Sequence, residues 1–382
     1  MNDGDSTPGP AGLPLRPFAL ERFYARWEFA VAHNLSASDV EPVSLAELLA
    51  LADPGSAALW AALRLGYTES AGHPLLREEI ARLYERVSAG DVLTVSGAEE
   101  GILLSVGALV GPGDHVVVVA PAYQSLHDVA RARGADASLV WLEAANGWRL
   151  DADRVLDALT PSTRLVVVNF PNNPTGSLPG AAEFQRLCAE CAERGIRFFS
   201  DEVYRGVEPE RGTRLPAAAD LGEGAISLGV MSKAYGLAGL RIGWIACRDP
   251  VVLHRVGALR DYTTICSSAP SEILAIMALR AGDVLIDRAR EIVSHNRALL
   301  ADFFAAHADT VRWVPPRAGT TAFPELIGRD ADAFCGRLAA EDGVLLLPGS
   351  SFDVPGGHFR VGLGRRGIER GLELLGGRLR EV

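Results

Sequence analysis

The segment Ser227–Trp244, SLGVMSKAYGLAGLRIGW, holds the side chains that most clearly suggest chemistry. Its one lysine, Lys233, stands in an otherwise apolar, glycine-punctuated run, and Arg241 follows further along. Low-polarity surroundings and nearby cations disfavour the charged form of an amine, so its pKa falls, as an aldehyde-trapping (Schiff-base) lysine requires. The planar guanidinium of Arg241 suits a dianion. The segment also fits a buried strand, a turn and a second strand with one lysine reaching the surface.

Three further motifs follow runs that read as buried strands. Asp201 opens DEVY, Asn173 lies in NFPNNPTG, and Gly97 stands between a strand and a helix. Ligands of parallel sheets bind beyond the carboxyl ends of the strands, and amides at a helix N-terminus bind phosphate. Each motif taken alone also has a structural interpretation: an acidic cap, a proline-rich turn and an ordinary strand–helix junction.

Composition limits the class of protein. The chain has 382 residues, 48% apolar and 22% charged, which is enough for one large domain and a smaller one. A net charge of −11 leaves no basic face for nucleic acid. The five cysteines are odd in number and scattered, which suits a reducing cytoplasm. Cys188 and Cys191 form C-x-x-C inside a helical run without a second pair, so we expect no metal site.

The N-terminal stretch 1–17 is rich in Gly, Pro and Ser and lacks the apolar core of a signal peptide, so we expect a flexible arm. No apolar run is long enough to span a membrane. The stretch Leu20–Val31 has helical spacing with four aromatic residues, a stripe typical of a core or a subunit contact. Arginine so dominates the cations that Lys233 stands nearly alone.

Apolar strands then alternate with helices, which predicts a largely parallel sheet buried on both faces. A long helix, Val284–Ala306, would lead into a C-terminal domain of short strands and two helices. The predicted strands of the large sheet are Val92–Val95, His115–Ala120, Ser138–Leu142, Leu165–Asn169, Arg197–Ser200, Ala225–Gly229 and Gly243–Cys247.

The pattern S-K-x-Y-G-L-x-G-L-R-x-G-W resembles the cofactor-lysine signature of the class I/II aminotransferases, which are fold-type-I pyridoxal-phosphate (PLP) enzymes. The resemblance spans roughly Leu35 to the C-terminus. It implies a three-layer αβα large domain with a mostly parallel sheet plus a smaller α+β domain, and a homodimer. We divide the chain into an arm (1–17), a segment packing on the small domain (18–45), the large PLP-binding domain (46–285) and the small domain (286–382).

The resemblance assigns the cofactor's reactive groups. Lys233 would bond the aldehyde, Asp201 would keep the ring nitrogen protonated, and Tyr204 and Asn173 would donate to the phenolic oxygen. Tyr123, in PAYQS, would stack on the ring. The phosphate would bind around a helix N-terminus, at Gly97, Ala98, Glu99, Ser232 and Arg241. One departure weakens Ser232: relatives carry a hydroxyl three residues before the lysine, where this chain has Val230.

Other matches concern the partner subunit and the substrate. Tyr67 would reach the phosphate of the neighbouring subunit, and Arg360, in FRVGLG, would clamp the substrate α-carboxylate, with Asn173 and Ser38 beside the substrate. Relatives carry a glycine-bearing turn near position 38, where this chain has SASDVEP. If Asp39 or Glu41 faced the pocket, a cationic substrate side chain would be favoured; a solvated acidic loop is the alternative.

The resemblance therefore predicts an aminotransferase that moves the amino group of an L-amino acid to a 2-oxo acid. Scattered matches, among them GTTAFP (319–324), also resemble capreomycidine synthase, a relative that eliminates a β-substituent from a hydroxylated arginine and closes a ring. The second hypothesis is such an elimination, replacement or cyclisation, because both reactions use one electron sink. A non-catalytic PLP-fold binding protein is the third.

Overall fold

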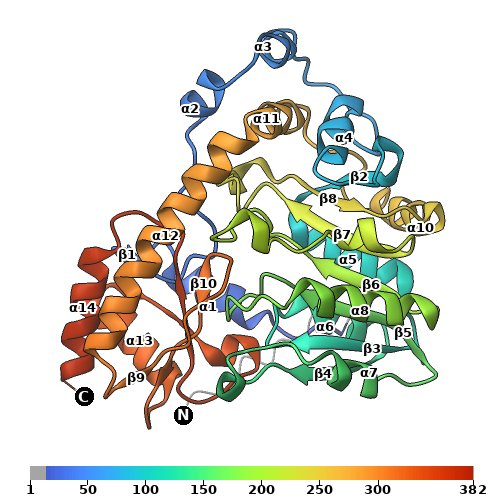
Figure 1. Ribbon diagram of the computed structural model, residues 1–382. Helices are drawn as coiled ribbons and strands as arrows, with labels where there is room; N and C mark the ends of the chain where they lie inside the picture. Colours follow the sequence, from blue (N-terminus) through green and yellow to red (C-terminus); the bar gives the residue numbers. More distant parts are fainter. Residues whose placement is uncertain (1–13, 382) are drawn as a thin grey trace.

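A seven-stranded sheet forms the centre of the protein, whose computed structural model describes residues 14–381 (Figure 1). The strand order is β2-β8-β7-β6-β5-β3-β4, and every neighbouring pair is parallel except the two that contain β8. The strands are β2 (Val92–Val95), β3 (His115–Ala120), β4 (Asp136–Trp141), β5 (Thr163–Asn169), β6 (Arg197–Asp201), β7 (Ala225–Val230) and β8 (Gly243–Ala246).

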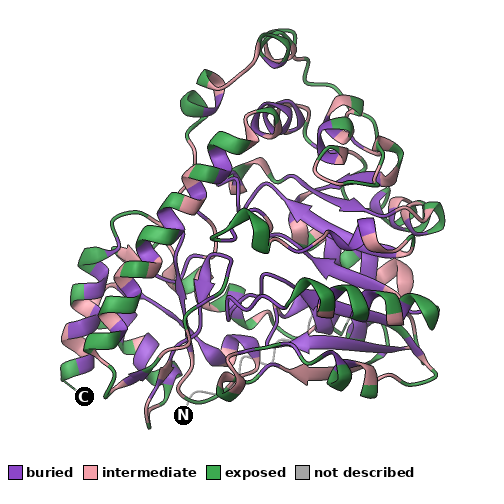
Figure 2. Ribbon diagram, in the orientation of Figure 1, coloured by how far each residue is buried: buried purple, intermediate pink, exposed green. Residues whose placement is uncertain are grey.

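Strand β3 shows why these runs are apolar throughout. All six of its residues are buried. Val116 and Val118 pack into one hydrophobic cluster, whereas Val117 and Val119 pack into another on the opposite face. Successive side chains of a strand point to opposite faces, so a sheet covered on both sides needs apolar residues at every position. Figure 2 shows the resulting buried sheet between more exposed helices.

Helices cover both faces of the sheet, so the large unit has three layers. Helices α5, α6 and α10 pack with one another on one face, and α7, α8 and α9 pack together on the other. The predicted fold class is confirmed. Their bounds are α5 (Gly97–Leu109), α6 (Ser125–Ala132), α7 (Ala152–Asp157), α8 (Ala181–Glu193), α9 (Ala218–Leu221) and α10 (Pro250–Arg260).

Helices from both ends of this region pack together beside the sheet. Helix α11 contacts α2, α3 and α4. Helix α3 begins at Pro54 because Asp53 accepts hydrogen bonds from Gly55 N and Ser56 N, and Pro54 occupies the first helical position. The bounds are α2 (Leu45–Ala50), α3 (Pro54–Ala61), α4 (Pro74–Ala81) and α11 (Ala269–Arg280).

Helix α12 (Gly282–Ala306) connects the large sheet to the C-terminal elements (Figure 1). There β14 pairs antiparallel with β10 and β13, and β9 pairs with β11. The adjoining strands β12 and β13 are two separate pieces, because they pair with different partners. The remaining bounds are β9 (Val311–Arg312), β10 (Thr321–Ala322), β11 (Glu325–Leu326), α13 (Ala331–Asp342), β12 (Val344–Leu345), β13 (Leu347–Pro348), β14 (Phe359–Gly362) and α14 (Glu369–Arg380).

The N-terminal segment packs on these C-terminal elements. After α1 (Ala19–Trp27), strand β1 (His33–Asn34) pairs parallel with β12. Most of the predicted arm, residues 1–13, lies outside the described residues, but the arm's end is not free, because Arg16 forms ion pairs of 2.6 Å with Asp128 and 2.9 Å with Asp353. The domain limits stay a prediction, since α12 runs across the proposed boundary at 285. Within residues 14–381, no helix is long and apolar enough to cross a membrane.

Gly362 offers a test of how tightly the N-terminal segment is held. Its amide donates to Leu35 O at 2.7 Å, and a Cβ added at Gly362 would lie 2.0 Å from Ala37 O. We therefore expect Gly362→Ala to lower the free energy of unfolding by about 1–3 kcal/mol. Gly377→Ala is the control, because nothing lies within 4 Å of that added Cβ and an alanine favours helix α14. Urea denaturation monitored by tryptophan fluorescence measures both, and equal midpoints for the two variants would contradict the close approach.

Candidate active site

A cavity of about 180 Å³ lies at the carboxyl ends of β5, β6 and β7. It is lined by residues of the sheet, of α1 and α5, and of the C-terminal part of the chain. Most of the residues predicted from the sequence meet here. The cavity is lined by Leu20, Glu21, Tyr24, Ser38, Ala98, Glu99, Ile102, Tyr123, Asn169, Asn173, Asp201, Val203, Tyr204, Val230, Ser232, Lys233, Arg241 and Arg360.

Lys233 follows β7 and is the only lysine in the chain. Its Nζ donates a hydrogen bond to Ser38 Oγ at 2.9 Å, and it lies 5.8 Å from the centroid of the Tyr204 ring. The amine is therefore held between the N-terminal segment and the loop after β6. A primary amine fixed in a cavity in this way is suited to nucleophilic and proton-transfer chemistry.

Asp201, the last residue of β6, presents a buried carboxyl to the cavity. Burial raises its pKa to about 7, although the Val203 amide, which donates to Oδ1 at 3.2 Å, and the charge of Lys233 both favour the ionised form. The backbone here is fixed by Asn169, whose Nδ2 donates to Asp201 O at 3.0 Å. A carboxyl with this pKa would become fully ionised beside a bound cation.

Arg360, on β14, is one of the most buried charged residues, with 1% of its surface exposed. Its guanidinium donates to Asn173 Oδ1 at 3.0 Å, to Ser36 O at 2.8 Å and to the Tyr24 hydroxyl. These contacts come from the sheet, the N-terminal segment and α1. They fix the guanidinium group on the wall of the cavity, where it can bind a carboxylate through two hydrogen bonds.

The N-terminus of α5 forms an anion cup together with Arg241. Gly97 has a φ of +81°, and a Cβ there would lie 2.5 Å from a guanidinium nitrogen of Arg241, so only glycine allows this approach. Ala98 and Ser232 line the cavity beside it. Free amides and the helix dipole at the start of a 13-residue helix favour a phosphate group in this position.

Two carboxyl groups lie on another part of the wall. Glu21, on α1, accepts a hydrogen bond from the Tyr123 hydroxyl at 2.8 Å. Glu99, on α5, accepts one from Ser125 Oγ at 3.0 Å. Burial, together with the negative charge of Glu21, raises the pKa of Glu99 to about 7. A cation beside Glu99 would favour the ionised form of this carboxyl.

Three predicted residues lie elsewhere. Tyr67 has 91% of its surface exposed and does not line the cavity, so a role for it requires a second subunit. Asp39 accepts from Arg365 Nη2 at 2.8 Å, and Glu41 accepts from the Arg366 amide at 3.3 Å. Neither acidic residue lines the cavity, so the hypothesis that one of them faces the substrate is wrong.

Sequence reasoning missed Glu21 and the part that Tyr24 and Ser36 play. The aromatic stripe of α1 was expected to be core or subunit contact, but Tyr24 bonds Arg360 and Glu21 lines the cavity. A single helical face carrying Glu21 and Tyr24 three residues apart was the available signal. Nothing local, however, indicated that α1 lies against the carboxyl edge of the sheet.

A sequence model of a known family, described as aminotransferase class I and II, matches residues 46–370. This match covers most of the chain. The chain belongs to the class I and II aminotransferases.

Members of this family with curated or solved examples resemble the chain along nearly its whole length. Capreomycidine synthase of Streptomyces vinaceus is 34% identical over 369 residues, 95% of this chain and 93% of the relative. A PLP-dependent aminotransferase from Streptococcus suis has a TM-score of 0.90 at 29% identity, covering 96% of this chain and 98% of the other. The PLP-dependent cyclase OrfR has a TM-score of 0.89 at 32% identity, covering 97% and 100%. Other curated relatives are transaminases that pair valine or arginine with pyruvate.

The raised pKa of Asp201 predicts a pH dependence of stability in this aminotransferase. The folded pKa of about 7 exceeds the ordinary value of 3.8, so the folded chain keeps a proton that the unfolded chain releases. This contribution is fully present below pH 3.8 and is lost as the pH rises to about 7. In Asp201→Asn the loss of stability across this window should be smaller by on the order of 1–3 kcal/mol.

The measurement is urea denaturation at a series of pH values, with no pyridoxal phosphate added. Asp309→Asn, which changes an exposed carboxyl, serves as the control and should follow the parent protein. Parallel curves for the parent and Asp201→Asn would show that burial does not raise this pKa.

Proposed function

We propose that the chain is a PLP-dependent enzyme that transfers the amino group of an L-amino acid with a cationic side chain to a 2-oxo acid. The observation that carries the proposal is one cavity with a lysine, a buried carboxyl, a buried arginine and two further carboxyls on its wall. Membership of the aminotransferase family supports the reaction class, and the two carboxyls, Glu21 and Glu99, support the substrate class.

The donor set fits pyridoxal 5'-phosphate. Lys233 offers the amine for its aldehyde, and Asp201 offers a carboxylate for its ring nitrogen. Tyr204 and Asn173 would donate to the phenolic oxygen; Asn173 Oδ1 already accepts from Arg360, which leaves its amide hydrogens available. Tyr123 would stack on the ring. The phosphate would bind in the cup at the N-terminus of α5, formed by Gly97, the backbone amides of Ala98 and Glu99, Ser232 and Arg241.

The bound cofactor supplies an electron sink for the negative charge that develops at the substrate Cα. Lys233 Nζ would be the base that takes the proton from that carbon. Its hydrogen bond to Ser38 Oγ holds the amine in the cavity, and Ser38 is fixed in turn because its carbonyl accepts from Thr320 Oγ1 at 2.6 Å. The position and the protonation of the Lys233 nitrogen thus control the removal of the proton from the substrate Cα.

Arg360 would orient the substrate through its α-carboxylate. The guanidinium is fixed by Asn173, Ser36 and Tyr24, so little side-chain freedom is lost when a carboxylate binds. Because β14 belongs to the C-terminal elements and Lys233 to the large sheet, a substrate bound to both would draw these parts together.

The side chain of the substrate would meet Glu21 and Glu99. A guanidinium or ammonium placed between them would favour the ionised form of Glu99 and could pair with both carboxyl groups. An apolar or acidic side chain gains neither interaction. We therefore place amino acids of the arginine type ahead of neutral and acidic ones.

A homodimer is part of the proposal. Tyr67 and Tyr262 each have 91% of their surface exposed, although both are large aromatic residues. Exposed aromatic side chains of this kind are typical of subunit interfaces. In a dimer, Tyr67 would reach the phosphate site of the partner subunit.

Elimination with ring closure is the second candidate, and a specific observation favours it. The chain covers all of the cyclase OrfR at a TM-score of 0.89 and is 34% identical to capreomycidine synthase. The same proton removal by Lys233 would then expel a β-hydroxyl as water, and a side-chain nitrogen would close on the β-carbon. The part of the cavity at Glu21 and Glu99, which would bind a cationic side chain, suits either reaction.

Lys233 as the only lysine gives a direct test of the cofactor assignment. Protein treated with pyridoxal phosphate and then with borohydride should carry one adduct on a side chain, in the peptide that contains residue 233. Lys233→Ala should carry none and should lose at least about 10³-fold of its turnover. In the control, Arg370→Lys, an exposed second amine should stay unmodified. A Lys233→Ala protein that keeps near-parental turnover would refute the assignment.

Glu21→Gln tests the substrate class. We expect kcat/KM for arginine with pyruvate to fall about 10- to 100-fold, because a charge-assisted contact is lost, while a neutral amino acid changes little. Glu41→Gln is the control from the acidic loop and should behave as the parent. Mass spectrometry of the products separates the reactions: a 2-oxo acid formed with alanine indicates transamination, whereas loss of water from hydroxyarginine without an acceptor indicates cyclisation. Equal losses for arginine and the neutral amino acid would remove Glu21 from the subsite.

A further inference from the structure

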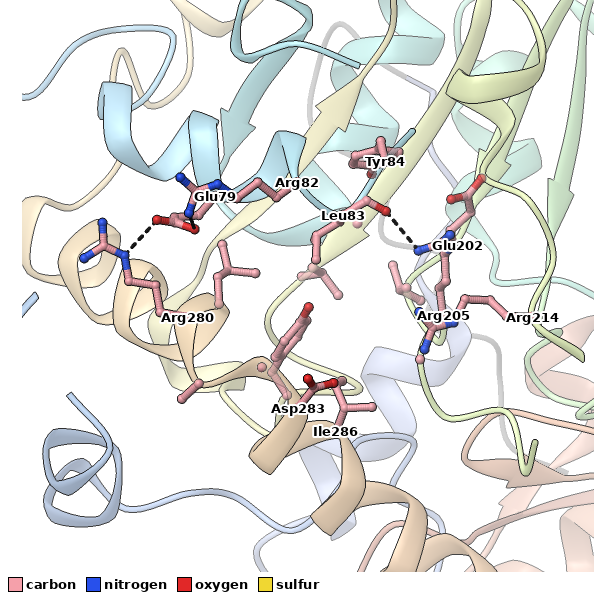
Figure 3. A pocket seen from close by; sticks show the side chains of 18 of the residues that line it. Glu79, Arg82, Leu83, Tyr84, Glu202, Arg205, Arg214, Arg280, Asp283 and Ile286 are labelled. Carbon is pink, nitrogen blue, oxygen red and sulfur yellow. Dashed lines mark hydrogen bonds and ion pairs between the residues drawn. The ribbon is translucent and has the colours of Figure 1, made fainter. Parts of the chain in front are cut away.

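A second cavity, of about 570 Å³, adjoins the candidate active site, and Figure 3 shows side chains that line it. Its wall comes from α4, the loop after β6, strands β7 and β8, and the junction of α11 with α12. Val203 and Val230 line both cavities, so these two residues are part of the wall between them. The volume falls in the range of sites for small molecules.

Arginines dominate the charged lining of this cavity. Six arginines and three carboxyls face it. Several are paired at the rim: Arg82 and Arg280 each bond Glu79 at 2.7 Å, as Figure 3 shows. The lining arginines are Arg82, Arg205, Arg211, Arg214, Arg280 and Arg290, and the carboxyls are Glu79, Glu202 and Asp283.

Two of these arginines have buried nitrogen atoms with no hydrogen-bond partner among the described residues. Arg205 donates from Nη1 to Leu83 O at 3.4 Å, and its buried Nε has no hydrogen-bond partner among the described residues (Figure 3). Arg290 donates to Asp287 at 3.2 Å, but its buried Nε and Nη2 likewise have no partner within residues 14–381. Buried donors without an acceptor are costly, so an anion bound between them would be stabilised.

The nearby carboxyls do not supply that anion. Glu202 is 7% exposed, and its Oε1 accepts from the Ala218 amide and from Ser227 Oγ, both at 2.8 Å. Its Oε2 has no hydrogen-bond partner among the described residues, so it does not accept from Arg205. Burial raises the pKa of Glu202. Glu208 bonds Arg214 at 3.4 Å; burial lowers the pKa of Arg214, and the charges of Arg205 and Arg290 lower it further, which indicates crowded positive charge.

Aromatic residues form another part of the wall. Tyr84, Tyr235 and Trp244 line the cavity, and Trp244 Nε1 donates to the Tyr84 hydroxyl at 2.8 Å. Trp244 lies so close to Gly229 that a Cβ there would be 2.2 Å from its ring. A ligand would therefore meet flat apolar surface as well as guanidinium groups.

We propose that this cavity binds a small organic oxyanion, a carboxylate or phosphate on an apolar body, with Arg205 and Arg290 as its anion partners. The site is distinct from the substrate site at Arg360, and its occupant would contact the reverse side of the residues that separate it from Lys233 and Asp201. Binding here therefore does not require the substrate site to be empty.

The test is isothermal titration of the holoenzyme with benzoate and phenyl phosphate, with neutral benzamide and inorganic phosphate for comparison. We expect both organic anions to bind, benzamide not to bind, and Arg205→Gln or Arg290→Gln to weaken binding about tenfold or more. Arg360→Gln excludes the substrate site and should leave this binding intact. Arg370→Gln, on the exposed surface of α14, is the matched control and should bind as the parent.

A variant at the rim of the cavity keeps the test decisive if the substitutions at the buried arginines prevent folding. Asp283 is 86% exposed, so Asp283→Asn should fold and should tighten binding by removing a negative charge from the lining. Binding that is lost in Arg360→Gln but unchanged in the other variants would overturn the proposal. So would the absence of saturable binding, or equal phosphate binding by every variant, which would mean an adventitious ion only.

Discussion

The register of three parallel strands is the constraint on which the active site depends. Asn169 at the end of β5 pairs with Asp201 at the end of β6, and Asp201 pairs with Leu228 of β7, two residues from that strand's end. Because the strands are parallel and in register, the loops that follow them begin at one edge of the sheet. Asn173, Tyr204 and Lys233 lie on those three loops, and a shift of one residue in any strand would turn its functional group away.

The second requirement is that the cavity be closed by parts of the chain that do not belong to the sheet. Ser36 and Ser38, in the N-terminal segment, bond Arg360 and Lys233 respectively. This short segment therefore links an arginine on β14 to the amine after β7. It also brings α1, with Glu21 and Tyr24, against the cavity. Recognition of both ends of a substrate then depends on contacts between distant parts of the chain.

The unusual choice of cations affects both cavities. With one lysine and otherwise arginine, the chain has a single side-chain amine able to trap an aldehyde, whereas its arginines bind anions as guanidinium ions. In the proposed active site the guanidiniums of Arg241 and Arg360 would bind anionic groups, and Lys233 would react. In the second cavity, where only arginines provide positive charge, the lining is suited to binding without covalent chemistry.

Sequence alone determined the sheet and the family, and it predicted the residues proposed to hold the cofactor, because these rest on local information. A strand covered on both faces must be apolar throughout, as in HVVVVA, and the lysine, aspartate and asparagine motifs each stand directly after such a strand. The sequence did not predict contacts between segments that are remote in the chain. Strands β12 and β13 belong to different sheets, and Asp39 and Glu41 bond arginines of the C-terminal region. Glu21 of α1 lines the cavity. Neither those pairings nor the guanidinium nitrogens of Arg205 and Arg290 that have no partner within residues 14–381 leave a periodic or local trace. Only the packing of distant elements decided them, since the energy of a buried charge depends on its neighbours in space rather than in sequence.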